Sequence, residues 1–268
     1  MGSIENKEMS FWDHLDELRK ILFRSFIVLI VFFIAIFMNK SFVFDTMMFA
    51  PTDSSFVLYR WISSLMTTVG LQPLEPFSIE LINIELATQF FTHINVSLTL
   101  AFIIGVPFIL YQIWLFVKPA LYENEKRAVQ KSFGFAAILF FIGVAVGYLF
   151  VFPLTFRFLG TYQVSELVEN QISLKSYISM FTSLLLVMGL VFEMPTLAAI
   201  LSRLGIITKS LLKRFRKHAF VALSFLAAII TPSGDAFTML IVALPLYLLY
   251  EFSIAICRDI DKQPDSSL

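Results

Sequence analysis

The sequence predicts an all-α membrane protein with six transmembrane helices and both termini on the inner side of the membrane. Of its 268 residues, 58% are apolar and 31 are Phe, and the mean hydropathy is +0.81. Soluble domains are usually about 45–50% apolar, so lipid must be the solvent for most of these side chains. The other two supporting observations are the lengths of the apolar runs and the distribution of positive charge.

Six apolar runs come near the roughly 20 residues that a helix needs to cross the hydrocarbon core. They cover about residues 21–38, 90–117, 133–152, 174–204, 219–230 and 237–256. We expect a single integral-membrane domain over residues 1–268, with flexible tails at about 1–9 and 259–268. The fifth run is short, which predicts a locally thinned bilayer or an end buried against neighbouring helices. Pro153 is expected to end the third span.

The first two spans are joined by a long loop of mixed polarity, residues 39–86. Within it Tyr59, Ile62, Met66 and Val69 recur at helical spacing, which predicts an amphipathic helix at the membrane surface. The second span is longer than a crossing requires, so it is expected to tilt.

Positive charge predicts the orientation. Placing the N terminus inside puts sixteen of the twenty Lys and Arg side chains on the inner side. This imbalance follows the positive-inside rule, and six spans return the C terminus to the inside. The net charge of zero argues against a nucleic-acid partner. One Cys and three scattered His residues provide neither a disulfide nor a metal site, and no cofactor is expected.

The segment 11–20, just before the first span, combines acidic, basic and aromatic side chains. Its apolar residues recur at helical spacing, which predicts a short amphipathic helix. One interpretation is an interfacial helix whose charges only orient the chain. The other is a polar recognition surface for a ligand presented at the membrane.

Glu193 is a carboxylate deep inside the fourth apolar run. Such a group costs about 2.5–3.5 kcal/mol on insertion scales. Pro195 frees a backbone carbonyl about one turn earlier, which makes the region polar as well as bent. Three interpretations are open. Glu193 is a protonated side chain bonded to a neighbouring helix, part of a polar patch that receives a partner helix or substrate segment, or the proton-carrying site of a small-molecule transporter.

Glu125 lies in a short inner loop that also contains Glu123, Lys126 and Arg127. It is either a solvated loop charge or part of a site, because this loop should lie close to the opening helix and Glu17. Two neighbouring carboxylates suit a guanidinium ligand, since Arg pairs with a carboxylate through two hydrogen bonds.

Enzyme motifs give little support to a catalytic function. Neither H-E-x-x-H nor G-x-S-x-G occurs in the sequence. Gly234-Asp235 is similar to the Gly-Asp of intramembrane aspartyl proteases, but a second Asp within a membrane span is missing. We therefore expect that the chain is not an enzyme.

Several ordered motifs cover nearly the whole chain. The first, His14–Arg19, has the sequence H-L-D-E-L-R. Further motifs occupy residues 107–116, 119–127, 152–154, 192–195, 231–235 and 245–251. Together they resemble the TatC family, the multispanning signal-peptide receptor subunits of the twin-arginine protein translocase.

The resemblance implies a concave helical bundle in the cytoplasmic membrane of a bacterium, with both termini cytoplasmic. It implies a receptor that binds twin-arginine signal peptides, recruits TatA/TatB-type single-span subunits and self-associates in a larger complex. Folded proteins would then be exported with the proton motive force. By position, it implies that the signal-peptide site contains Glu17, Arg19, Phe116 and Glu125. It likewise implies that Glu193 and Asp235 serve as intramembrane polar groups that contact a partner helix.

Two positions depart from the family pattern. Ser233-Gly234 replaces a commoner single residue and offsets the turn before Asp235. Met239 stands where a Gln is often found. The alternative function is a proton-coupled small-molecule transporter that uses Glu193, although no internal repeat is visible.

Overall fold

The computed structural model describes residues 11–120, 123–165, 167, 170–231 and 235–257. Over these residues, five helical stretches are long and apolar enough to cross a membrane. They run over His14–Met38, Thr88–Val117, Val129–Thr161, Leu174–Arg203 and Ala236–Ile256. The predicted all-α membrane class is confirmed. The tails expected at about 1–9 and 259–268 lie outside the described residues.

Three of the stretches are built on single helices. These are α1 (Phe11–Met38), α3 (Thr88–Val117) and α10 (Ala236–Ile256). Pro107 lies inside α3 and Pro245 inside α10, and neither ends its helix. Long apolar helices tolerate proline in this way because neighbouring groups satisfy the freed backbone carbonyls.

The third stretch continues past the proline that was expected to end it. α4 (Glu123–Val146) passes through a π-helical turn, η4 (Gly147–Val151), into α5 (Phe152–Thr161). Pro153 lies in the first turn of α5, where its missing N–H is not needed. The expectation that Pro153 ends this helix was therefore wrong, because the π-helical turn prepares a new helix start.

The fourth stretch consists of two helices rather than one. α6 (Leu174–Val191) and α7 (Met194–Arg203) meet at Phe192 and Glu193. Pro195 occupies the first turn of α7. The helix is thus interrupted at the polar, proline-containing segment, and Glu193 lies at the junction.

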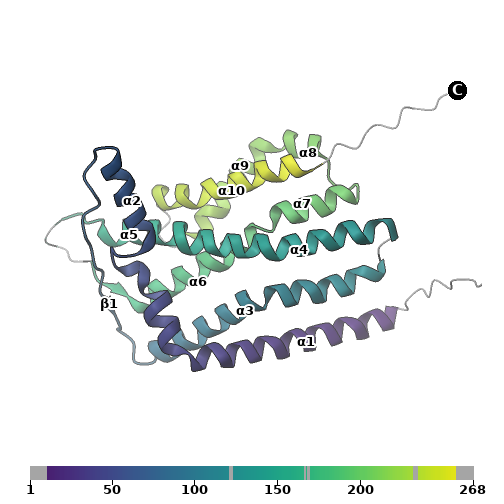
Figure 1. Cartoon of the computed structure of the whole chain (residues 1–268), viewed down its shortest axis with the longest axis horizontal. Coiled ribbons are helices and arrows are strands. Elements are labelled where there is room, and N and C mark those ends of the chain that lie inside the picture. The colour runs from purple at the N-terminus through teal and green to yellow at the C-terminus, as the bar shows by residue number, and fades with distance from the viewer. Residues whose placement is uncertain (1–10, 121–122, 166, 168–169, 232–234, 258–268) are drawn as a thin grey trace, which may run out of the picture.

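The short fifth apolar run forms α9 (Arg216–Ile230), which follows the small helix α8 (Lys209–Arg214). α9 has 15 residues and is therefore about 22 Å long, less than the roughly 30 Å of the hydrocarbon core. It packs against α10. The start of α1 and the end of α10 lie at the same end of the molecule, which we call the terminal end (Figure 1).

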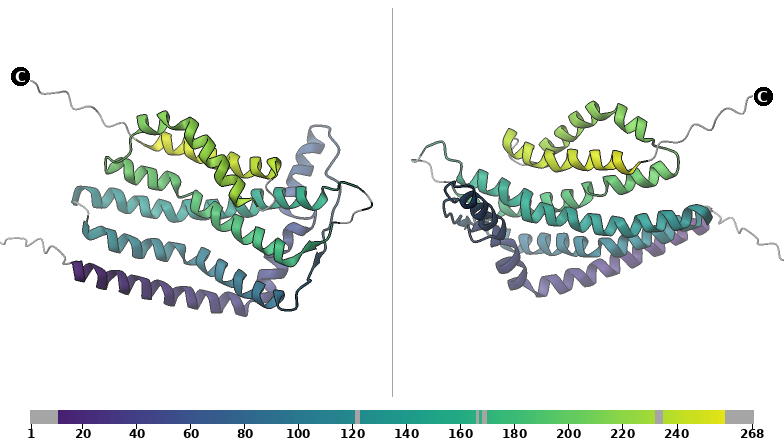
Figure 2. Two further views of the ribbon diagram at one scale, coloured as in Figure 1. Left: turned by 180° about the vertical axis from the view of Figure 1, so that it is seen from behind. Right: turned by 45° about the horizontal axis from the view of Figure 1, so that its top comes forward.

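The long helices lie side by side (Figures 1 and 2). α1 packs against α3, α3 against α4 and α6, α4 against α7, and α7 against α10. α1 is at the edge of this row, and few of its apolar side chains are buried. Phe23, Phe26 and Val31 are all more than half exposed, which suits contact with lipid tails.

Glycines allow α4 and α6 to approach closely at the centre of the molecule. A Cβ added at Gly143 would lie 2.6 Å from the Met188 carbonyl oxygen, and one at Gly189 would lie 2.7 Å from the Phe140 ring. Small residues at helix contacts are typical of membrane proteins, where van der Waals packing replaces the hydrophobic effect. The core continues into fully buried side chains such as Leu184.

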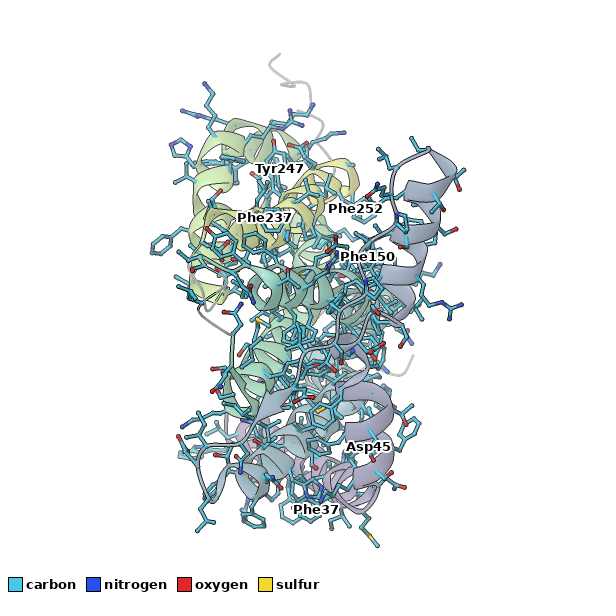
Figure 3. The ribbon with its side chains drawn as sticks, turned by 90° about the vertical axis from the view of Figure 1, so that its left-hand side faces the viewer. Phe37, Asp45, Phe150, Phe237, Tyr247 and Phe252 are labelled. Atoms are coloured by element: carbon cyan, nitrogen blue, oxygen red, sulfur yellow. The ribbon has the colours of Figure 1, made fainter. Side chains whose placement is uncertain are left out.

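The opposite end, which we call the cap end, is covered by the chain between α1 and α3. Its elements are η1 (Phe42–Met48), η2 (Ala50–Thr52), α2 (Val57–Thr68) and strand β1 (Leu81–Ile82), which pairs in parallel with β2 (Ile172–Ser173). Figure 3 views the molecule from this end, with Asp45 on η1. The helix predicted from the spacing of Tyr59 to Val69 is confirmed as α2.

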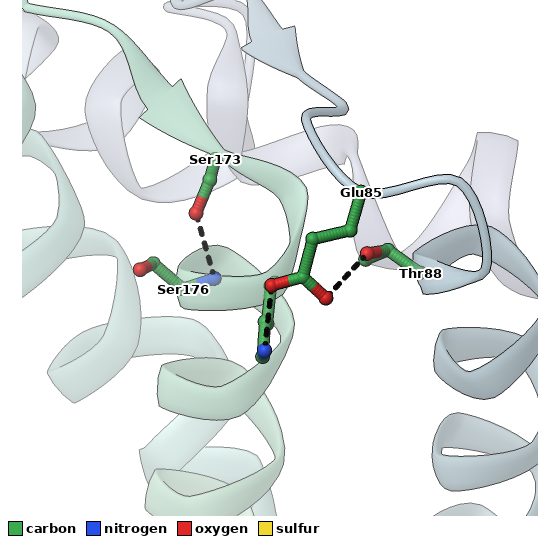
Figure 4. Close-up of polar contacts among 5 residues, drawn as sticks. Glu85, Thr88, Ser173 and Ser176 are labelled. Atoms are coloured by element: carbon green, nitrogen blue, oxygen red, sulfur yellow. Dashed lines mark hydrogen bonds and ion pairs between the residues drawn. The ribbon is translucent and has the colours of Figure 1, made fainter.

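Hydrogen bonds and an ion pair connect the elements of the cap end, which we call the cap, to the long helices. The Tyr59 hydroxyl donates to the Pro153 carbonyl oxygen at 2.8 Å, and the Tyr177 hydroxyl donates to that of Met48. Lys175 at the start of α6 pairs with Glu85, whose other carboxylate oxygen accepts a hydrogen bond from Thr88 (Figure 4). The Lys175 ammonium holds the pKa of the Glu85 carboxyl below its ordinary value.

Candidate functional site

At the terminal end, the first turn of α1 lies against the last turn of α3. The rings of His14 and Phe116 are stacked, with centroids 4.1 Å apart and planes inclined by 27°. Farther along, a Cβ added at Gly105 of α3 would lie 2.8 Å from the Leu29 side chain, so the two helices are in close contact. The opening segment is therefore packed onto the bundle through α3.

Glu17 and Arg19 follow His14 on α1. Glu17 is partly exposed and pairs with Lys20 one turn later, with 3.3 Å between Oε2 and Nζ. Arg19 is exposed and borders an open depression of about 560 Å³ on α1. Its other lining residues are apolar: Leu15, Leu18, Leu22, Phe23 and Phe26. The charged Arg19 and an apolar surface thus lie next to each other on this helix.

Glu125 belongs to the first turn of α4, and its side chain lies outside the described part of the chain. The backbone places that turn at the terminal end, because the short helix η3 (Lys118–Ala120) directly follows α3. Trp114 on α3 contacts Phe133 on α4, with ring centroids 5.6 Å apart. The convergence of the Glu17 and Glu125 carboxylates stays a prediction.

The structure adds Gln112 to the candidate residues. It lies on the terminal half of α3 and is only 4% exposed, and its Oε1 has no hydrogen-bond partner among the described residues. A buried amide without a partner is costly, which makes it a candidate for a ligand contact. The sequence feature that could have pointed to it is an amide side chain inside an apolar run.

Glu193 lies at the junction of α6 and α7, where it is partly buried. Its Oε1 has no hydrogen-bond partner within the part of the chain that the structure describes. α4 crosses close by, since a Cβ at Gly143 would lie 2.7 Å from the Phe192 side chain. The carboxylate therefore keeps hydrogen-bonding capacity beside a tight helix contact.

Asp235 has a structural task. It is the N-cap residue of α10, and its Oδ1 accepts a hydrogen bond from the Thr238 backbone N–H at 2.8 Å. Its Oδ2 accepts another from the Thr238 hydroxyl at 2.6 Å. Such a cap satisfies a backbone donor that the helix leaves free. Asp235 and Glu193 thus differ in their bonding, although the sequence placed them in one group.

The fold and these groups define a multi-pass membrane protein with charged and aromatic side chains gathered at one end of its helices. Among the described residues, no three His, Cys, Asp or Glu side chains are arranged to hold a metal ion.

Comparisons with known proteins identify the family. The family described as "Sec-independent protein translocase protein (TatC)" matches residues 13–245. A Blattabacterium protein named Sec-independent protein translocase protein TatC is 34% identical over 97% of this chain and 98% of its own. The protein of that name from Desulforapulum autotrophicum is also 34% identical, over 98% of this chain and 90% of its own.

Solved structures agree with the sequence comparison. A crystal structure titled twin arginine translocase receptor TatC has a TM-score of 0.70 and 34% identity over 91% of this chain and 97% of its own. A second, in the detergent DDM, has a TM-score of 0.73 and 33% identity over 91% of this chain and 99% of its own. The chain belongs to the TatC family. It is a multi-pass bacterial membrane protein of a protein-transport family and not an enzyme, as expected.

Proposed function

We propose that this chain is the receptor subunit of a twin-arginine translocase. It binds twin-arginine signal peptides at the cytoplasmic face and recruits TatA/TatB-type single-span subunits, so that folded proteins are exported with the proton motive force. Family membership supports this function. The observation that carries it is the stacking of His14 on Phe116, which holds the charged start of α1 against the end of α3.

The site chemistry follows from the two acidic residues. In the proposed complex, the guanidinium groups of the signal peptide pair with Glu17 and Glu125. Glu17 gives up only an exposed ion pair with Lys20, and such pairs are worth about 0–1 kcal/mol. A charge-assisted bond to guanidinium contributes about 1.5–3 kcal/mol, so the exchange favours the peptide. Phe116, which stacks on His14, borders this site, and Arg19 lies next to the apolar depression on α1.

The apolar segment of the signal peptide needs an apolar surface next to the charged site. The depression on α1 between Leu15 and Phe26 begins beside Arg19 and continues along the helix. Because α1 is the edge helix, a second helix or an extended segment has access to it without disturbing the core. The peptide would bury apolar surface there in place of lipid contacts.

We place the chain in the cytoplasmic membrane as a single integral-membrane domain with six spans, the sixth crossing being supplied by the short α9. The terminal end faces the cytoplasm. Positive charge supports this orientation, since sixteen of the twenty Lys and Arg residues belong to that side in a six-span arrangement. Self-association into a larger complex remains part of the proposal.

Glu193 is proposed as the contact for a single-span partner helix. A carboxylate oxygen that lacks a hydrogen-bond partner among the described residues can accept one from a polar group of an incoming helix. Asp235 contributes indirectly, by capping the start of α10. The small-molecule transporter, considered from sequence alone, receives no support from the comparisons.

Export of a folded cargo tests the function. Cells that lack the chain are expected to retain a twin-arginine reporter protein in the cytoplasm, and the chain should restore its export when its single-span partners are present. A reporter whose two arginines are replaced by lysines serves as the matched control. Transport of small solutes by the purified chain alone in liposomes, together with normal export in its absence, would overturn the proposal.

A further inference from the structure

A polar pocket lies between α4, α7 and α10 at the terminal end. Its volume is about 290 Å³. It is lined by Lys131, Ser132, Phe135, Pro195, Thr196, Ala199, Arg203 and Ile256. Two of these residues are cationic and none is acidic. The pocket is thus positively charged and is separate from the surface formed by α1 and α3.

The two cations approach the pocket from different helices. Lys131 lies on α4, two residues before its apolar run begins, and Arg203 is the last residue of α7. Both residues are exposed, so their charged groups are accessible from outside the bundle. Cationic side chains at this depth lie near the level of lipid head groups.

Hydroxyl groups line the inner part of the pocket. Thr196 is 3% exposed, and its hydroxyl lies beside the carboxyl of Glu193, three residues earlier in the chain. Ser132 is 7% exposed. Thr196 precedes Arg203 by two helical turns, about 10 Å along the axis. The pocket therefore has exposed cationic side chains at its opening and buried hydroxyl groups further in.

The surroundings favour a lipid over a water-soluble anion. Phe135 lines the pocket and is 42% exposed, and Leu197, next to Thr196, is 57% exposed. These apolar side chains face outward on helices that cross the membrane. A ligand that joins an anionic group to acyl chains would satisfy the cations and cover these side chains at the same time.

We propose that this pocket binds the head group of an anionic phospholipid. Its phosphate lies between Lys131 and Arg203, and its glycerol ester accepts a hydrogen bond from Thr196. Basic pockets between transmembrane helices are a known basis for binding anionic head groups. The inference concerns a site other than the proposed peptide site and does not depend on the proposed function.

Lipid competition tests the proposal directly. The purified full chain in detergent is offered equal amounts of phosphatidylglycerol and phosphatidylethanolamine, and bound lipid is counted by native mass spectrometry. We expect preferential binding of phosphatidylglycerol. The double variant Lys131→Ala/Arg203→Ala should weaken that binding by about tenfold or more, since a charge-assisted bond is lost at each position. Thr196→Val should weaken it less.

The control variant Lys213→Ala/Arg214→Ala removes the same charge from α8 and should bind as the unaltered chain does. Lys131→Arg/Arg203→Lys keeps both charges and should keep the preference, which separates a lost site from a failure to fold. Equal binding of the two lipids, or equal losses in both alanine double variants, would overturn the proposal. Displacement of the lipid by excess inorganic phosphate would assign the pocket to free phosphate instead.

Discussion

His14 and Phe116 are 102 positions apart in the sequence, and their rings are stacked with centroids 4.1 Å apart. This contact fixes the start of α1 to the end of α3. It explains how the charged segment before the first span becomes part of a surface that three helices share, since α4 begins just after α3. An interfacial helix that only oriented the chain would not need this contact.

The close contact of α4 with α6 predicts opposite effects for two glycines on one helix. Gly143→Ala places a Cβ 2.6 Å from the Met188 carbonyl oxygen and should destabilise the fold by about 1–3 kcal/mol. Gly134→Ala meets no atom within 4 Å and should stabilise it by about 0.5–1 kcal/mol. Unfolding in detergent measures both. Equal effects would contradict the described packing.

The ion pair between Glu85 and Lys175 predicts a pH-dependent contribution to the stability of the cap. Its neighbours lower the pKa of Glu85, so the contribution is present above the ordinary pKa of a Glu side chain and is lost as the pH falls through the lowered value. Glu85→Gln should therefore melt slightly below the unaltered chain at pH 7 and together with it at pH 3. A difference that grows towards acid pH would refute this.

Substitutions of Asp235 can distinguish the contribution of its charge to stability from that of its N-cap hydrogen bond. Asp235→Asn retains a side-chain oxygen that can accept the hydrogen bond from the Thr238 N–H, whereas Asp235→Ala loses it, at a cost of about 0.5–2 kcal/mol. The unfolding temperature of the Asp235→Asn variant should therefore be close to that of the unaltered chain and well above that of Asp235→Ala. If Asp235→Asn and Asp235→Ala destabilised the fold equally, the charge of the carboxylate would matter and not its N-cap hydrogen bond.

Substitution of Glu193 should affect binding of the single-span partner and binding of the signal peptide differently. Glu193→Ala should reduce co-purification of a single-span partner by about tenfold, the effect of losing one hydrogen bond to a buried polar group. Crosslinking of a signal peptide should change much less, because the peptide site lies at the terminal end. Glu193→Gln preserves a hydrogen-bonding side chain and should retain more of the partner. Loss of peptide capture with intact partner binding would contradict the assignment.

Much of the fold could be predicted from the sequence, because a bilayer leaves few ways to satisfy backbone groups and long apolar runs must form helices. Pro153 misled the prediction, since a π-helical turn before it cannot be recognised from composition. Pro195 predicted a bend near Glu193, and the structure has a break there between α6 and α7. Asp235 before Thr238 at the start of an apolar run was an available N-cap signature whose meaning was missed.

The candidate site could be predicted only in part. Glu17 and Arg19 were recognisable because they stand in an ordered motif. The contact of His14 with Phe116 was not, since no local pattern encodes a contact between helices that are distant in sequence. Gln112 was visible as an amide in an apolar run, but only burial distinguishes it from a solvent-facing residue.

Site-specific crosslinking tests the central claim most directly. A twin-arginine precursor with a photoreactive group next to its arginine pair is presented to membranes that contain the chain. Glu17→Ala and Glu125→Ala should each reduce crosslinking to the chain by about tenfold, given the strength of charge-assisted bonds. Asp16→Ala, an exposed acidic neighbour on the same helix, should leave it unchanged. Unchanged crosslinking with both Glu17→Ala and Glu125→Ala would contradict the proposed peptide site.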